Sequence, residues 1–144
     1  MNTRSMGFLI LFFRIIVGVT MIFYGGIKIF HIQFGVPDDV LMQTIGQTDL
    51  MTLSWYLADH EPFRSFVGGT EIVIGCVFFH KRFFLIAALV SLPVWIGILV
   101  VDLTFMRYNN SVIALVIGML SLSLVQIFTY RRQMISAFNE IINL

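Results

Sequence analysis

The sequence predicts an all-α fold: one domain, residues 1–144, built as a bundle of four transmembrane helices. The first observation is composition, because 58% of the residues are hydrophobic and only 12% are charged, against roughly a quarter in a soluble domain. The second is a mean hydropathy of +0.93. The third is length, since 144 residues hold about four crossings of roughly 20 residues each. The four apolar segments cover about 8–30, 62–79, 83–103 and 111–129.

The first segment is apolar from Phe8 to Phe30, but it contains Arg14 and, near its end, Lys28. A charged side chain in the hydrocarbon of a bilayer is costly unless it is paired or faces the interior of a bundle. We therefore expect the other three segments to provide partners for these two cations.

The longest connection between segments runs from His31 to Glu61 and is rich in acidic residues. Pro37 precedes two aspartates, a pattern that begins short helices. Further along, Trp55 and Tyr56 have side chains that favour the membrane–water interface. We expect a long first extracytoplasmic loop that contains short interfacial helices, lying on the membrane surface or folded back over the bundle.

The remaining segments are separated by short polar turns. Pro62 opens the second segment, since proline is tolerated in a first helical turn, and a short amphipathic tail follows the fourth. Lysine and arginine gather on the cytoplasmic side of membrane proteins. A cytoplasmic N-terminus would place five of them on that side: Arg4, Lys81, Arg82, Arg131 and Arg132. We therefore expect a multi-pass protein of the bacterial cytoplasmic (inner) membrane with both termini in the cytoplasm.

Small and polar residues recur every three or four positions on each segment, which places them on one helix face. Helices in lipid associate through small residues that allow close backbone approach, so we expect these faces to point inward. The faces comprise Arg14, Gly18, Met21, Gly25 and Lys28; Arg64, Gly68, Glu71, Gly75 and Phe78; Ala88, Ser91, Trp95, Ile98 and Asp102; and Ser111, Ala114, Gly118, Ser121 and Val125.

Depth along the helices, counted at about 1.5 Å per residue, suggests which charges meet. Arg14 and Glu71 fall at a similar depth inside the membrane, and Lys28 and Asp102 both fall near the outer boundary. The sequence therefore predicts two charge pairs, Arg14 with Glu71 and Lys28 with Asp102.

Four further side chains are expected in the inner polar layer. Ser91 and Ser121 lie at the depth of the inner pair. The hydroxyl of Tyr24 and the indole N–H of Trp95 need polar partners when buried. The layer can act as an ion pair that fixes helix register, as a pocket for a quinone headgroup or lipid, or as a proton or ion path; the structural role is favoured, and the path least.

Several functional classes find no support in the sequence. A lone cysteine, Cys76, provides no dithiol chemistry, and His31, His60 and His80 show no metal-ligand spacing. No nucleotide-binding, hydrolase or zinc-protease motif is present, and the net charge of +1 does not suggest a nucleic-acid partner. The sequence thus predicts no metal site and no catalytic residue, and favours a chain without catalytic activity of its own.

Two stretches carry a family resemblance. The first has an arginine, a glycine four residues on, then a glycine and a lysine: Arg14, Gly18, Gly25 or Gly26, and Lys28. The second has a glutamate, a glycine four residues later and a basic turn: Glu71, Gly75 and Lys81-Arg82. By these residues the chain resembles the DoxX-like family of four-helix membrane proteins. The resemblance implies kinship with small subunits of quinone-linked oxidoreductases and with factors that help other membrane proteins mature or assemble.

The functional prediction is a small integral accessory subunit of a larger membrane complex of the respiratory or quinone-linked redox kind. Its partners would be the lipid bilayer and other membrane-protein subunits. One alternative is a protein that binds a quinone or lipid through the layer of Arg14 and Glu71, which makes quinone the one cofactor considered. The other alternative is an assembly factor for another membrane protein.

Overall fold

The computed structural model describes residues 3–33, 50–105 and 110–142 of the chain. Within these ranges all the regular structure is α-helical, which confirms the predicted all-α class. The helices are α1 (Thr3–Ile29), α3 (Leu50–Ala58), α4 (Phe63–Phe78), α5 (Phe84–Phe105) and α6 (Asn110–Ile142). The short helix expected to begin near Pro37 lies outside the described residues.

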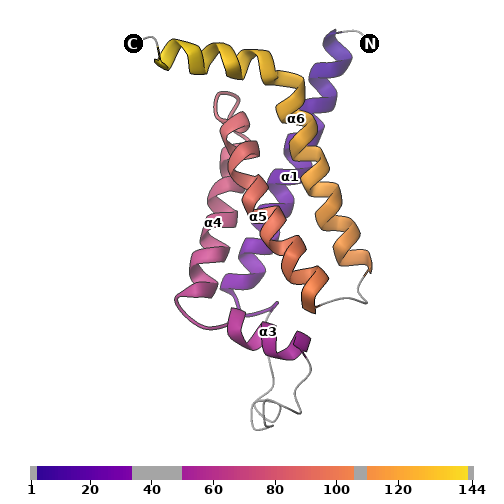
Figure 1. Cartoon of the computed structure of the whole chain (residues 1–144), viewed down its shortest axis with the longest axis vertical. Helices are drawn as coiled ribbons and strands as arrows, with labels where there is room; N and C mark the ends of the chain where they lie inside the picture. Colours follow the sequence, from indigo (N-terminus) through magenta and orange to yellow (C-terminus); the bar gives the residue numbers. More distant parts are fainter. Residues whose placement is uncertain (1–2, 34–49, 106–109, 143–144) are drawn as a thin grey trace.

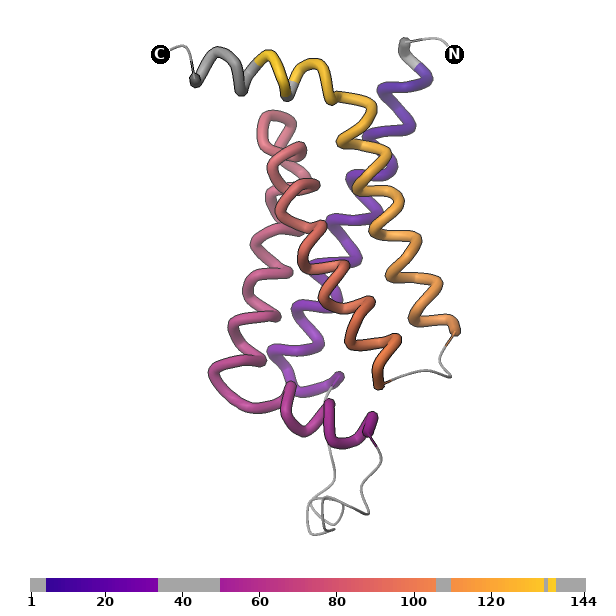
Figure 2. Tube along the Cα trace, viewed as in Figure 1, coloured from indigo at the N-terminus to yellow at the C-terminus, as the bar shows by residue number. Residues whose placement is uncertain are grey.

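Four long helices run side by side, and the short helix α3 lies across one end of the bundle (Figure 1). α3 contains Trp55 and packs against α5, so the loop segment predicted to fold back over the bundle does so. α6 bends at the opposite end, and its C-terminal part leaves the bundle near the start of α1 (Figure 2). The first and last helical turns of the chain therefore lie at the same end of the molecule.

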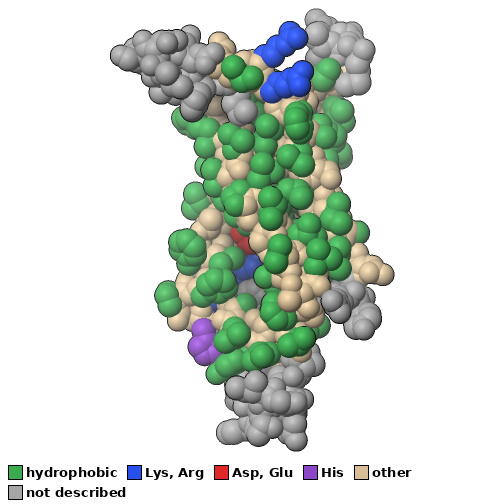
Figure 3. Space-filling model, viewed as in Figure 1, with side chains coloured by type: hydrophobic (Ala, Val, Ile, Leu, Met, Phe, Trp, Pro, Cys, Tyr) green, Lys and Arg blue, Asp and Glu red, His purple; other side chains and the backbone are tan. Residues whose placement is uncertain are grey.

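Three helices of the described chain are long and apolar enough to cross a membrane: α1, α5 and α6. The second predicted span, 62–79, falls short, because α4 begins only after Pro62 and has 16 residues. A helix of that length spans about 24 Å, against roughly 30 Å of hydrocarbon in a bilayer. Apolar side chains cover much of the outer surface (Figure 3), as expected for helices of this composition.

A close backbone contact joins α1 to α4 through glycines. A Cβ atom on Gly25 would lie 2.5 Å from the carbonyl oxygen of Gly68, and one on Gly68 would lie 2.8 Å from that of Gly25. Gly18 and Gly75 face each other in the same way, with distances of 3.1 and 2.8 Å. The two contacts fix the antiparallel register of α1 and α4, and they confirm the inward faces predicted for both helices.

The core between α5 and α6 corrects the face predicted for the fourth segment. Ser111, Ala114, Ser121 and Val125 are exposed. The buried side of α6 carries instead Val116, Ser123, Gln126 and Ile127. The prediction failed because it treated serine as a residue that must face inward. Ser121 donates its hydroxyl proton to the carbonyl of Ile117 on its own helix, at 2.8 Å, and a serine satisfied in this way can face apolar surroundings.

Gly25→Ala should destabilise the fold by about 1–3 kcal/mol, because an added methyl group overpacks the contact with Gly68. Gly26→Ala is the matched control: nothing lies within 4 Å of a Cβ there, and alanine favours the helix by up to about 1 kcal/mol. Thermal unfolding of the detergent-solubilised protein measures both. Equal midpoints for the two variants would contradict the glycine contact.

Candidate functional site

A buried ion pair joins α1 to α4 across the level of the contact between Gly25 and Gly68. The Lys28 ammonium donates to both carboxylate oxygens of Glu71, at 2.7 and 2.6 Å, and the two residues are 5% and 2% exposed. The ring of Tyr24 lies 5.8 Å from the same ammonium, within the range of a cation–π contact. Both charges are thus neutralised by each other inside an apolar interface.

This pairing replaces the predicted pair of Arg14 with Glu71. The glycine register places Glu71 between the levels of Arg14 and Lys28. The direction in which the side chains lean therefore decides which of the two cations Glu71 can reach. Helical side chains lean toward the N-terminus of their own helix. On antiparallel helices Lys28 and Glu71 therefore lean toward each other, whereas Arg14 leans away from Glu71. Counting depth alone could not detect this.

Arg14 finds its partner on the backbone. Its Nε and Nη2 atoms donate to the carbonyl oxygen of Phe78, at 3.0 and 2.9 Å, and its guanidinium lies 4.5 Å from the centroid of the Phe84 ring. Phe78 ends α4, where helix carbonyls lack intrahelical donors and the helix dipole is negative. Arg14 thus stabilises the C-terminus of α4 rather than a carboxylate.

Asp102 is buried, at 4% exposed, but the predicted ion pair with Lys28 does not form. The salt bridge of Lys28 goes to Glu71, and Lys28 attracts Asp102 only over a longer distance. The Oδ2 atom of Asp102 is buried and has no hydrogen-bond donor among the described residues. A buried carboxylate in this condition is costly and calls for an explanation.

The other predicted members of the polar layer are scattered. Ser91 is buried, its hydroxyl donates to the carbonyl of Ala88 at 2.9 Å, and it lies 3.2 Å from the Ser123 hydroxyl. Ser123 therefore takes the place foreseen for the exposed Ser121. Trp95 is buried in the α5–α6 core, and its indole nitrogen has no acceptor among the described residues. Tyr24 meets Lys28 with its ring rather than with its hydroxyl.

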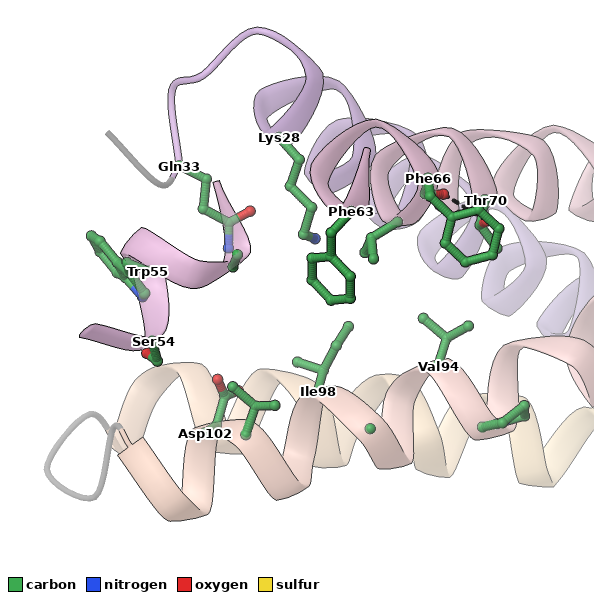
Figure 4. A pocket seen from close by; sticks show the side chains of 15 residues that line it. Lys28, Gln33, Ser54, Trp55, Phe63, Phe66, Thr70, Val94, Ile98 and Asp102 are labelled. Atoms are coloured by element: carbon green, nitrogen blue, oxygen red, sulfur yellow. Dashed lines mark hydrogen bonds between the residues drawn. The ribbon is translucent and has the colours of Figure 1, made fainter. Parts of the chain in front are cut away.

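A cavity of about 370 Å³ lies between α4 and α5, closed at one end by α3. Figure 4 shows five polar side chains at the α3 end: Lys28, Gln33, Ser54, Trp55 and Asp102. The rest of the wall includes Phe63, Phe66, Val94 and Ile98 and is apolar apart from Thr70, whose hydroxyl donates to its own helix. The cavity is therefore amphipathic, with a polar end and an apolar length.

The cavity opens on the side of the molecule. Figure 3 shows acidic and basic side chains at the floor of a hollow in an otherwise apolar face. Phe66 of α4 is 71% exposed at this surface and Val101 of α5 is 43% exposed. A ligand would reach the polar end from the same apolar surroundings that the helices contact.

A second charged cluster holds the α3 end together. Arg64, which is 6% exposed, donates to the carbonyl and Oδ1 oxygens of Asp59, both at 3.1 Å, and contacts Glu61 and His31. The Ser65 hydroxyl donates to Glu61 at 2.7 Å; this bond, with the Arg64 guanidinium, lowers the pKa of the Glu61 carboxyl.

His31 ends α1 with a left-handed backbone (φ 59°), the position that glycine usually occupies. The Ile32 N–H donates to the carbonyl of Ile27 at 2.9 Å, and the His31 N–H donates to that of Lys28 at 3.1 Å. The chain reverses there, and this reversal brings Gln33 to the cavity.

Sequence reasoning missed the cavity and three of its polar residues. Gln33 and Ser54 lie in the long loop, where no helical periodicity marks them, and Trp55 was assigned only to an interface. The one usable signal was Asp102, a lone carboxylate in an apolar helix. Its expected cation, Lys28, is bound by Glu71 in the structure. We found no match to this chain among protein-family models, curated protein sequences or solved structures.

Lys28→Met should destabilise the protein by about 3–5 kcal/mol, because it leaves the Glu71 carboxylate buried without its cation. The double variant Lys28→Met/Glu71→Met should recover much of that loss, since both charges are then gone. Arg82→Gln, which removes an exposed cation, serves as the control and should change little. Thermal midpoints in one detergent measure all three, and a double variant no more stable than Lys28→Met would refute the pair.

Proposed function

We propose that the protein is an integral membrane protein that binds a small lipid-soluble ligand in the cavity between α4 and α5. The observation that carries this proposal is the combination of a laterally open apolar cavity with a buried, unpartnered carboxylate oxygen at its polar end. Pockets that are mostly apolar with a few convergent polar groups are the usual form of small-ligand sites.

In this proposal α4 crosses the bilayer as a fourth, shorter span. α4 packs along α1 through Gly18, Gly25, Gly68 and Gly75, the small-residue packing typical of membrane helices. A short span is tolerated when the bilayer thins or when flanking residues reach the interface. Inside lipid, α4 keeps its charged groups on the α1 side, where Glu71 meets Lys28.

We also propose the predicted orientation, with both termini in the cytoplasm of a bacterial cell. The α4–α5 turn carries exposed Lys81 and Arg82, and α6 carries exposed Arg131 and Arg132. Acidic Asp59 and Glu61 lie at the α3 end. Positive charge on the cytoplasmic side is the usual arrangement, which would turn the α3 end and the polar end of the cavity outward.

The ligand-binding role is preferred here to the predicted accessory subunit. An apolar outer surface can contact lipid as well as a partner subunit, so it does not distinguish an accessory subunit from a protein that acts alone. The cavity and the unpartnered Asp102 favour a ligand specifically. Membership of a redox complex, a role in assembly, a quinone as the ligand and kinship with DoxX-like proteins stay predictions.

Ligand binding can be tested by native mass spectrometry of the full chain released from detergent. We expect at least one of decylubiquinone, dodecan-1-ol, dodecylamine and dodecanoic acid to bind as a single molecule per chain and to saturate. Gly97→Leu should abolish this binding, because Gly97 lines the cavity and has free space where a side chain would grow into it.

Gly69→Leu is the matched control, since Gly69 also has free space but does not line the cavity; it should bind as the natural chain does. Absence of saturable binding for every probe, or equal binding by Gly97→Leu, would overturn the proposed function.

Orientation can be tested with single cysteines in a Cys76→Ser background. In intact spheroplasts a membrane-impermeant maleimide should label His60→Cys, whereas Lys81→Cys should react only after permeabilisation. The reverse pattern would contradict the orientation and place the polar end of the cavity on the cytoplasmic side.

A further inference from the structure

At the polar end of the cavity, hydrogen-bond acceptors lack donors and a carboxylate lacks an ion-pair partner among the described residues. We propose that the ligand of the cavity is a lipid-soluble amine, held as the ammonium ion with its head at Asp102 and Gln33 and its tail between α4 and α5. This inference rests on the proposed function and deepens it by naming the chemical class of the ligand.

Two hydrogen-bond acceptors at the polar end lack donors. The Oδ2 atom of Asp102 and the Oε1 atom of Gln33 are buried and have no donor among the described residues. Both side chains lie at the same end of the cavity (Figure 4). Two such acceptors favour a ligand that donates, and a primary ammonium group donates three hydrogen bonds.

The charges at the polar end are also unequal. Lys28 donates to both oxygens of Glu71, so Asp102 forms no ion pair with a cation of the described residues. An ionised carboxylate in an apolar wall calls for a cation, and a cationic head would hold Asp102 ionised and bring the local charge to zero. A hydroxyl head would donate to an acceptor but would not compensate the charge of an Asp102 carboxylate. A carboxylate head would add a second negative charge beside Asp102.

The shape of the wall also favours such a ligand. Away from the polar end, the cavity is lined by apolar side chains that include Phe66, Val94 and Ile98, which suit an alkyl or aryl tail. Trp55 and Phe63 are close to the polar end (Figure 4), and aromatic rings attract cations. The cavity thus offers an acidic, partly aromatic place for the head and an apolar slot for the tail.

The test compares three probes with the same tail: dodecylamine, dodecan-1-ol and dodecanoic acid. Native mass spectrometry of the full chain at neutral pH measures the bound fraction of each. We expect the amine to bind about tenfold or more tightly than the alcohol, the size of a charge-assisted hydrogen bond, and the acid to bind most weakly.

Asp102→Asn should bring amine and alcohol to similar affinities, because it keeps the shape and removes the charge. Glu61→Gln is the charge-matched control: it removes a more exposed acid at the same end of the molecule that does not line the cavity, and should keep the preference for the amine. Gln33→Leu, which leaves the charge in place, should weaken amine binding by a smaller factor, and serves as a second variant if Asp102→Asn folds poorly.

The outcomes separate the two proposals. Equal binding of amine and alcohol, or unchanged amine binding in Asp102→Asn, overturns the amine while the cavity remains a ligand site. If neither the three probes nor decylubiquinone binds, the amine and the proposed function are overturned together.

Discussion

The close packing of α1 against α4 is the constraint on which the rest of the structure depends. Gly25 and Gly68 let the two backbones approach until no Cβ atom fits between them. That approach brings Lys28 within hydrogen-bond distance of Glu71, so both charges can be buried. It also holds the carbonyl of Phe78 against Arg14. Packing between small residues and charge neutralisation are therefore one arrangement: the glycines determine the distance at which the polar groups can meet, and the polar groups oppose any slip of the register.

The same packing accounts for the position of the cavity. α4 packs along α1 far more extensively than along α5, and the side chains that α4 turns toward α5 include Phe63 and Phe66 rather than glycines. The contact between α4 and α5 is therefore less extensive, and the space between the two helices is covered at one end by α3. The polar end of the cavity lies there because Lys28 and Asp102 both come near the ends of their helices, where the Arg64 cluster fastens α3 and the end of α1 to α4.

Polar groups in an apolar protein need partners, and this chain supplies them in two ways. Lys28 and Glu71 use each other. Arg14 and Ser121 use backbone carbonyls, which helices leave available at their C-termini or share along their length. Among the described residues, Arg64 Nε, Trp95 Nε1 and Gln126 Oε1 are buried without a partner, and so are acceptor atoms of Asp102 and Gln33. Of these atoms, only the acceptors of Asp102 and Gln33 lie together at the cavity, and this shared position is the basis for assigning a ligand there.

The sequence by itself determined the all-α class, the approximate bounds of α4 and α5, and the inward faces of α1, α4 and α5, but α6 extends well beyond the predicted end near 129, to Ile142. These properties follow from hydrophobic periodicity and from the cost of exposing charge to lipid, which act residue by residue. It did not determine the face of α6, because a serine bonded to its own helix is indifferent to which side it faces. Nor could it determine the partners of Arg14, Lys28 and Asp102, because those depend on the register of two helices, on the lean of their side chains and on backbone carbonyls. Register and side-chain neighbours exist only once the helices have packed. The position and lining of the cavity depend on that packing, so only the tertiary structure could determine them.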